Sequence, residues 1–364
     1  MRKDIDALSM LGVSQDTKRL TTVHTGLLAF RADANSIIGW GHMMRCLSLA
    51  DALGDAGEQC IFITSDQVSA ELVHNHRNKV FVLDSQGNNC MDKLDKLLEL
   101  IHTIGVHRLV VDSYHVNTRY FDALSRIVSV TYIDDEGKEA FNIDQLVNYN
   151  ISSESVDYHN LYQGKETEFI LGCEYTPIRK QFNHVVPKIR KDVHTILLSA
   201  GATDIHHFKT HFLTFIKPKE IFSRIHWHVL CTNISDEEKL WEDMYKNITL
   251  VSGVEDMSKI MLQSDIALSA GGTTLYELCA CGVPTISFSI ADNQVPNAVC
   301  FDQKGIIQYA GDIRDQQDVV FGNIDKFLQE LTIDSDLRTE KSRRMRNLVD
   351  GNGAQRLAKR LISM

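Results

Sequence analysis

Short apolar runs alternate with longer amphipathic stretches along most of this chain. Runs such as those at 27–30, 129–133 and 194–199 have the length and composition of strands buried in a parallel sheet. Between such runs, apolar residues recur three or four positions apart, which is the spacing of one helix face. In 41–56, for example, the apolar positions are Met43, Cys46, Leu47, Ala50 and Leu53. The alternation predicts an α/β protein built from parallel sheets covered by helices.

The same pattern gives bounds for the individual elements. In the first half we expect strands over 27–30, 59–64, 80–83, 108–112, 129–133, 145–148 and 169–171, and helices over 41–56, 90–104 and 118–126. In the second half we expect strands over 194–199, 226–231, 248–251, 266–269, 285–288 and 306–309, and helices over 208–215, 257–263, 273–281, 293–304, 337–349 and 354–362.

The position of proline divides the chain into two halves. All 5 prolines lie beyond residue 176, and the basic segment 177–192 carries two of them, so it is the expected linker. We expect one Rossmann-like domain over 25–176 and a second over 193–335. Residues 336–364 would form C-terminal helices, and residues 1–24 a polar leader without an assigned role.

Composition limits the classes of protein that fit. A length of 364 residues is sufficient for two α/β domains. The net charge of −10 argues against non-specific binding of nucleic acid. The 8 cysteines form no C-x-x-C pair and no apolar run reaches the length of a membrane span. We therefore expect a cytoplasmic protein with reduced thiols, and the oligomeric state stays open, with a monomer compatible with the sequence.

A glycine loop follows the first predicted strand. Gly39 and Gly41 flank Trp40, and His42 stands in the first turn of the next helix. Glycines allow close approach of a ligand, and a helix start favours an anion. A histidine at this place can exchange a proton near neutral pH, although it can also simply cap the loop. Arg45, one turn later, can meet a phosphate or form a salt bridge.

A second glycine turn follows the predicted strand 266–269. Gly271 and Gly272 permit close approach, while the hydroxyls and N–H groups of Thr273 and Thr274 suit a phosphate or cap the helix. Glu277, in the next turn, can accept two hydrogen bonds from a ribose diol, or it can be a surface glutamate. A third loop, with Gly201, follows the strand 194–199. All three loops would face one crevice at the carboxyl ends of the strands.

Two further loops carry candidate polar contacts. Asn293 and Gln294 can read sugar hydroxyls, although Asp292 or Asn293 can instead cap a helix. Asp112 ends the strand 108–112, and Tyr114 follows two residues later. Tyr114 can hydrogen-bond a substrate and Asp112 can orient a base, while turn formation explains the same residues. The histidine pairs of the chain lack the carboxylate or cysteine partners of a zinc site, so we expect no metal and no other cofactor.

The order of these motifs resembles the hydrolases of pseudaminic acid biosynthesis and the related spore-coat-polysaccharide proteins. More distantly, it is similar to the N-acetylglucosaminyltransferase that makes lipid II. The resemblance covers about residues 27–364. The matching segments are 30–33, 39–47, 111–114, 132–135, 148–150, 171–175, 269–277, 292–294 and 350–354.

The resemblance implies the two-domain GT-B architecture and a UDP-activated amino sugar as substrate. The hydrolases release UDP from UDP-2,4-diacetamido-2,4,6-trideoxy-β-L-altropyranose. By resemblance, His42 is the base that activates water for inverting attack at the anomeric carbon, without a metal. Gly271–Thr274 would lie near the diphosphate, Glu277 on the ribose, and the last helix would cross back to the first domain. Arg31 could neutralise phosphate charge.

Other functions use the same donor site. A UDP-sugar-dependent glycosyltransferase would need an acceptor surface on the first domain, and the sequence has no strong basic amphipathic stretch for a lipid acceptor. A non-catalytic nucleotide-sugar binder would not need His42. A hydrolysing epimerase that acts on a UDP-hexosamine is a variant of the hydrolase. The sequence does not determine the sugar.

Overall fold

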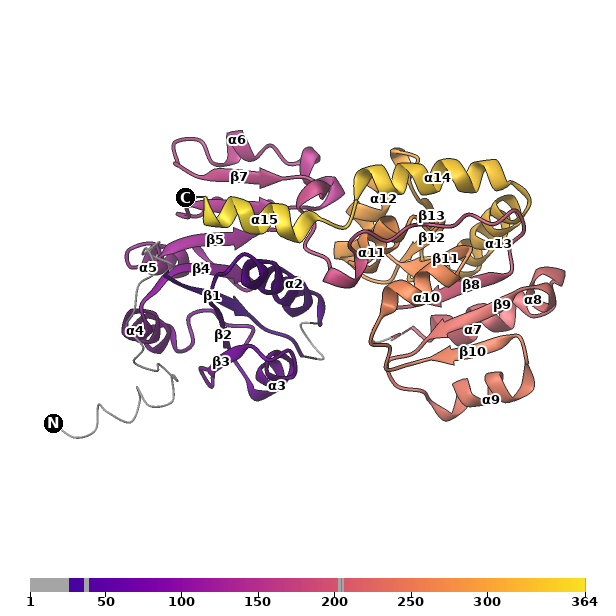
Figure 1. Cartoon of the computed structure of the whole chain (residues 1–364), viewed down its shortest axis with the longest axis horizontal. Coiled ribbons are helices and arrows are strands. Elements are labelled where there is room, and N and C mark those ends of the chain that lie inside the picture. Colours follow the sequence, from indigo (N-terminus) through magenta and orange to yellow (C-terminus); the bar gives the residue numbers. More distant parts are fainter. Residues whose placement is uncertain (1–25, 36–38, 202–203, 205, 364) are drawn as a thin grey trace.

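Two fully parallel sheets organise the residues that the computed structural model describes, which are 26–35, 39–201, 204 and 206–363 (Figure 1). The first sheet has 7 strands in the order β3-β2-β1-β4-β5-β6-β7, and the second has 6 in the order β10-β9-β8-β11-β12-β13. In each sheet the order reverses between two neighbouring strands, β1 and β4 or β8 and β11. Ligands of open α/β sheets bind at the carboxyl ends of the strands at such reversals.

The first sheet and its helices occupy the chain up to Leu171. Its strands are β1 Leu27–Ala32, β2 Cys60–Thr64, β3 Lys79–Val82, β4 Val106–Asp112, β5 Ser129–Ile133, β6 Gln145–Asn148 and β7 Glu168–Leu171. Its helices are α2 Gly41–Asp55, α3 Gln67–Asn75, α4 Leu94–Ile104, α5 Thr118–Leu124 and α6 Tyr158–Leu161. The short 3-10 turn η1 Ile151–Ser155 lies between β6 and α6, and the turns η2 Cys173–Tyr175 and η3 Lys180–Phe182 come after β7.

The second sheet begins at Thr195. Its strands are β8 Thr195–Ser199, β9 His226–Leu230, β10 Ile248–Val251, β11 Ile266–Ala270, β12 Thr285–Ser289 and β13 Gln308–Asp312. Its helices are α7 Phe208–Ile216, α8 Glu220–Arg224, α9 Asp236–Met244, α10 Met257–Gln263, α11 Thr274–Cys281 and α12 Val295–Gln303, with η4 Asp292–Gln294 before α12. Three helices end the chain: α13 Gln317–Ile333, α14 Ser335–Leu348 and α15 Gly353–Ile362.

All predicted strands and helices are present, most with both ends within two residues of these bounds. Three of the differences are as follows. The helix expected from residue 90 begins at Leu94, because Lys93 adopts a left-handed conformation with φ of 60°. The helix expected from 293 begins at Val295, after the 3-10 turn η4 and with proline in its first turn. The strand expected at 306–309 lies at Gln308–Asp312. The leader 1–24 and Ala202 and Thr203 of the third loop lie outside the described residues.

The sequence pattern also left several helices unassigned. In α13 the buried residues Val320, Phe321, Ile324, Leu328 and Leu331 have helical spacing, so this helix was detectable. In α9, by contrast, only Glu238 and Trp241 are buried. That helix is fixed by a capping box, in which Ser235 and Glu238 exchange hydrogen bonds with each other's backbone N–H groups.

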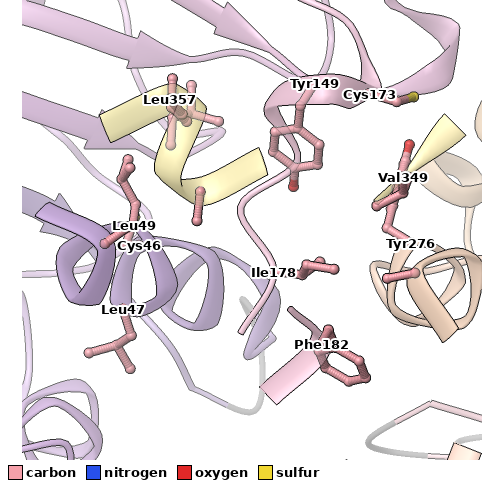
Figure 2. Packing of buried hydrophobic residues seen from close by; sticks show 14 of the residues in the cluster. Cys46, Leu47, Leu49, Tyr149, Cys173, Ile178, Phe182, Tyr276, Val349 and Leu357 are labelled. Carbon is pink, nitrogen blue, oxygen red and sulfur yellow. The ribbon is translucent and has the colours of Figure 1, made fainter. Parts of the chain in front are cut away.

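The last helix returns to the first sheet. Figure 1 shows α14 over the second sheet and α15 beside α2 and β5, and α15 contacts α2 directly. Figure 2 shows the resulting core, in which Leu357 of α15, Ile178 and Phe182 of the connecting segment, and Tyr276 of α11 lie around one apolar cluster. The two halves of the molecule therefore share a continuous core.

Gly353 sets how closely α15 approaches the connecting segment. A Cβ at this position would lie 2.3 Å from the Thr176 carbonyl oxygen and 2.6 Å from its nitrogen. We expect Gly353→Ala to destabilise the protein by about 1–3 kcal/mol, because backbone atoms must move to admit the methyl group. Chemical denaturation measures the change.

A second glycine substitution provides the control. Gly322 lies exposed inside α13, and a Cβ there would meet nothing within 4 Å. Gly322→Ala should raise the free energy of unfolding by roughly 0.5–1 kcal/mol, because alanine favours the helix. Equal effects of the two substitutions would show that α15 is not docked through Gly353.

Candidate active site

His42 and Asp112 form a buried pair at the reversal point of the first sheet. The loop after β1 leads into α2, where His42 is the second residue and only 6% exposed. Asp112 is the last residue of β4, and it pairs with Ala32 at the end of β1. The His42 Nδ1 atom lies 2.6 Å from Asp112 Oδ1. The start of α2 and the end of β4, which are far apart in sequence, thus bring a carboxylate to the candidate base.

Arg45 binds both oxygens of the Asp112 carboxylate. Its Nε donates to Oδ2 at 2.5 Å and its Nη2 to Oδ1 at 2.5 Å. Its Nη1 donates to Asp135 at 2.8 Å and to the Tyr149 hydroxyl at 2.7 Å. Of the two interpretations of Arg45, these contacts favour the salt bridge over a phosphate contact, because every nitrogen of the guanidinium already has an acceptor.

The charges around Asp112 determine the protonation of its carboxyl. Burial alone would raise the pKa of the Asp112 carboxyl, but Arg45 and His42 hold that pKa well below its usual value. The carboxylate is therefore ionised and can only accept. The short contact with His42 then requires a proton on Nδ1, which leaves the lone pair of the neutral ring on Nε2. This is the tautomer that a general base needs.

Tyr114 extends this cluster towards the second half of the chain. Its ring meets the His42 ring edge-on, with centroids 4.5 Å apart. The hydroxyl donates to Asp135 at 3.0 Å, and an interaction with the Asn293 side chain acts to lower the pKa of Tyr114. Two residues selected from the sequence, Tyr114 and Asn293, therefore meet across the crevice. Burial raises the pKa of Tyr114 well above its usual value, so the hydroxyl stays protonated.

A cavity of about 200 Å³ lies at the carboxyl edge of the second sheet. Gly201, Thr274 and Glu277, which were selected from the sequence, line it. The other residues in its wall come from the ends of β8, β9 and β10, from α10, and from the connecting segment: Arg179, Ser199, Leu230, Cys231, Thr232, Val251, Ser252, Gly253, Val254, Met257 and Met261. The wall thus combines apolar side chains such as Leu230 and Val251 with polar ones such as Arg179 and Glu277.

Arg179 is a residue of this site that the sequence did not reveal. Its Nε and Nη2 donate to Glu277 Oε1 at 3.0 and 2.9 Å. Burial raises the pKa of Glu277, and the charge of Arg179 opposes that change. The basic character of the segment 177–192 was the only available signal, and it pointed to a linker. The structure uses this linker as part of the pocket wall.

The two clusters are neighbours. A smaller cavity, of about 30 Å³, is lined by Gly41 and Arg45 from the first half and by Thr273 and Glu277 from the second, with Arg179 between them. Arg45, which holds the Asp112 partner of His42, and Glu277, which also lines the cavity of about 200 Å³, therefore border one small cavity. A larger cavity, of about 650 Å³, lies elsewhere, between α6, β7 and Tyr175, and none of the candidate residues line it.

The glycines differ in what they provide. A Cβ on Gly39, Gly41 or Gly272 would meet nothing within 4 Å, so the space beside them is open to a ligand. At Gly271, by contrast, a Cβ would lie 3.1 Å from the Gln294 Cβ. Gly271 therefore serves packing.

Gln294 is likewise engaged inside its own domain. Its Oε1 accepts from the Ile290 N–H at 3.0 Å. This contact favours a structural role in the turn before α12 over a direct contact with a sugar.

Arg31 does not reach the crevice as an available cation. It is 8% exposed, and its guanidinium donates to Asp33 at 2.6 Å and to Ser65 at 2.5 Å. These contacts favour an ion pair with Asp33 over the expected role on a phosphate.

The described residues contain neither a metal-binding cluster nor a membrane-spanning helix. In the part of the chain that the structure describes, no group of three or more His, Cys, Asp and Glu side chains could hold a metal ion. Among the same residues, no helix has the length and apolar character needed to cross a membrane.

Comparisons with known proteins agree with this architecture. No protein-family model matches the chain. The chain is 24% identical over 278 residues to the UDP-2,4-diacetamido-2,4,6-trideoxy-beta-L-altropyranose hydrolase of Campylobacter jejuni, a match that covers 76% of this chain and 96% of the relative. It is also 24% identical over 343 residues to a UDP-N-acetylglucosamine--N-acetylmuramyl-(pentapeptide) pyrophosphoryl-undecaprenol N-acetylglucosamine transferase of that species, covering 88% of this chain and 94% of the relative.

Among solved structures, MurG of Acinetobacter baumannii matches with a TM-score of 0.67 at 14% identity. The match covers 93% of this chain and 99% of that one. At such identity the likeness concerns the fold, and it agrees with the two parallel sheets described above. The chain therefore has the two-domain α/β fold of the GT-B glycosyltransferases, and its sequence is distantly similar to that of a UDP-sugar hydrolase.

Proposed function

We propose that this protein is a nucleotide-sugar hydrolase that releases UDP from a UDP-activated diacetamido-trideoxy sugar. The observation that carries the proposal is the buried His42–Asp112 pair, held by Arg45, which lines one small cavity together with Glu277. A neutral imidazole oriented by a carboxylate is suited to remove a proton from water. The similarity to the Campylobacter jejuni hydrolase supports the choice of reaction and sugar.

The proposed reaction has one displacement step. His42 Nε2 takes a proton from a water molecule as its oxygen bonds to the anomeric carbon. The bond between that carbon and the β-phosphate oxygen breaks, and its electron pair leaves with UDP. The configuration at the anomeric carbon inverts. Asp112 stabilises the imidazolium that forms, and Tyr114 and Asn293 would contact the sugar.

The nucleotide would occupy the cavity beside α11. Glu277 would accept hydrogen bonds from the ribose, and the Gly272, Thr273 and Thr274 backbone would face the diphosphate at the helix start. Arg179, beside Glu277, adds a positive charge that the leaving diphosphate can use. In this proposal no metal is needed, because the helix start and Arg179 supply the positive potential.

A glycosyltransferase is the second candidate, because the match to the Campylobacter jejuni transferase covers 88% of this chain. Incubation of the protein with UDP-2,4-diacetamido-2,4,6-trideoxy-β-L-altropyranose in ¹⁸O-labelled water separates the candidates. Free sugar that carries the label, together with unlabelled UDP, is the result expected of the hydrolase. Label in UDP would contradict attack at carbon. Turnover only after addition of an acceptor would favour the transferase.

Glu277 allows a test of the nucleotide pocket that does not depend on turnover. We expect Glu277→Gln to weaken UDP binding by about 10- to 100-fold, because a charged acceptor of two ribose hydrogen bonds is replaced by a neutral one. Isothermal titration calorimetry with UDP measures the change.

The matched control is Glu237→Gln, an exposed position on α9 of the same half of the chain. It should leave the UDP affinity within about twofold of the original, since surface changes are nearly neutral. Unchanged affinity in Glu277→Gln would place UDP elsewhere.

A further inference from the structure

A buried asparagine joins the His42 cluster to the second half of the molecule. Asn150 follows β6 and is 5% exposed. Its Nδ2 donates to Asp135 Oδ1 at 2.8 Å. Its Oδ1 accepts from the Tyr276 hydroxyl at 3.2 Å and from Asn297 Nδ2 at 3.3 Å. One side of this amide thus faces a carboxylate of the first half, and the other side faces two donors of the second half.

On the first side, the contacts lead step by step to the candidate base. Asp135 accepts from Arg45 at 2.8 and 3.0 Å, and Arg45 holds Asp112 through two bonds of 2.5 Å. Asp112 in turn fixes the His42 ring through Nδ1. The orientation of the imidazole therefore depends on where the Arg45 guanidinium lies, and that position depends on Asp135.

On the second side, the contacts lead to the helix that lines the nucleotide pocket. Tyr276 is 2% exposed and stands next to Glu277 in α11. Its hydroxyl accepts from the Ile151 N–H at 3.1 Å while it donates to Asn150. Its ring meets the Tyr149 ring edge-on at 5.8 Å. Figure 2 shows Tyr149 and Tyr276 reaching one shared core from different segments.

The hydrogen-bond pattern permits only one orientation of the Asn150 amide. A reversed amide would turn its carbonyl towards the Asp135 carboxylate, which offers no proton, and its NH₂ towards the NH₂ of Asn297. Neither contact would be satisfied in a buried place. The amide is therefore held by residues of both halves of the molecule, and a shift of its partners in one half changes its contact in the other.

We propose that Asn150 is a positioning residue that links the position of α11 to the orientation of the His42 base. This inference rests on the proposed function, in which α11 holds the nucleotide and His42 activates water. When α11 and α12 hold Tyr276 and Asn297 in place, these two residues fix the Asn150 amide, and Asn150 holds Asp135 against Arg45. The Asp112–His42 pair then has the geometry needed for attack.

Two conservative variants test this path. Asn150→Asp keeps the side-chain shape and replaces the donor that faces Asp135 by an acceptor. Tyr276→Phe keeps the ring contact and removes the hydroxyl. We expect each variant to lower kcat by up to about 100-fold, because the base is misplaced, and to keep the UDP affinity within about threefold. The double variant should lose little more than the worse single variant, since both act on one path.

Lys304→Gln is the matched control. Lys304 pairs with Glu154 at 2.6 Å, an exposed contact between the same two halves that lies outside the path. It should leave kcat unchanged within about twofold. Parallel losses of kcat and UDP affinity in the Asn150 and Tyr276 variants, or additive losses in the double variant, would overturn the inference.

A spectroscopic measurement tests the inference without turnover. The ring ¹H–¹⁵N signals of His42, assigned by their loss in His42→Ala, should shift in ligand-free Asn150→Asp and Tyr276→Phe and stay in place in Lys304→Gln. Unchanged His42 signals in both variants would overturn the positioning role. Shifted signals in a protein that hydrolyses no UDP-sugar would contradict the proposed function and leave the positioning path intact.

Discussion

Replacement of His42 by alanine should lower kcat for UDP-sugar hydrolysis by about 1,000-fold, within the range that a general base contributes. The imidazole is the group that Asp112 orients at 2.6 Å, and in the proposed reaction it alone takes the proton from water. UDP should bind with its affinity unchanged within about threefold, because the nucleotide pocket is lined by other residues. Product assays and calorimetry with UDP measure the two effects separately.

His74→Ala is the control for this substitution. His74 is an exposed residue of α3 in the same half of the chain, so its loss should leave kcat unchanged within about twofold. His42→Ala that retained more than a tenth of the original kcat would exclude His42 as the base. A loss of UDP affinity equal to the loss of kcat would assign His42 to binding.

The fold could be predicted from the sequence because its signals are local. Each strand is a short apolar run, and each glycine loop marks a strand end. The predicted strands at 129–133 and 145–148 agree with β5 and β6 residue for residue. Helices with little apolar periodicity, such as α9, are not predicted by the apolar pattern, because their stability comes from capping and from packing against distant residues.

The candidate site was predictable only in part, for a different physical reason. His42 and Glu277 stand beside glycine loops, and a loop of that kind can be recognised from its own residues. Arg179, Asp135 and Asn150 act through partners that are far away in the sequence, such as the Glu277 that Arg179 meets 98 positions later. No local pattern encodes such a contact. The same limit explains Arg31, whose partner Ser65 lies on another strand end.

Replacement of Asp112 by asparagine should give the largest loss of stability among the residues of the site. Asp112 is 1% exposed and accepts from Arg45 through both oxygens. Removal of one partner from a buried ion pair typically costs about 3–5 kcal/mol, and Asp135 remains to compensate part of the Arg45 charge. We therefore expect a loss of about 3 kcal/mol at pH 7, measured by urea unfolding. Asp243→Asn, an exposed change on α9, should alter stability by less than about 0.5 kcal/mol.

The pH dependence of this difference tests its electrostatic origin. The pKa of Asp112 in the folded protein lies well below the usual value, whereas in the unfolded chain it returns to about 3.9. Below about pH 4 the unfolded chain binds a proton here that the folded protein does not, so the original protein loses stability as the pH falls. Asp112→Asn has no such group. The stability difference between the two proteins should therefore shrink below about pH 4. A difference that stayed constant to pH 3 would mean that Asp112 stabilises the site by its shape and hydrogen bonds, with no contribution from its charge.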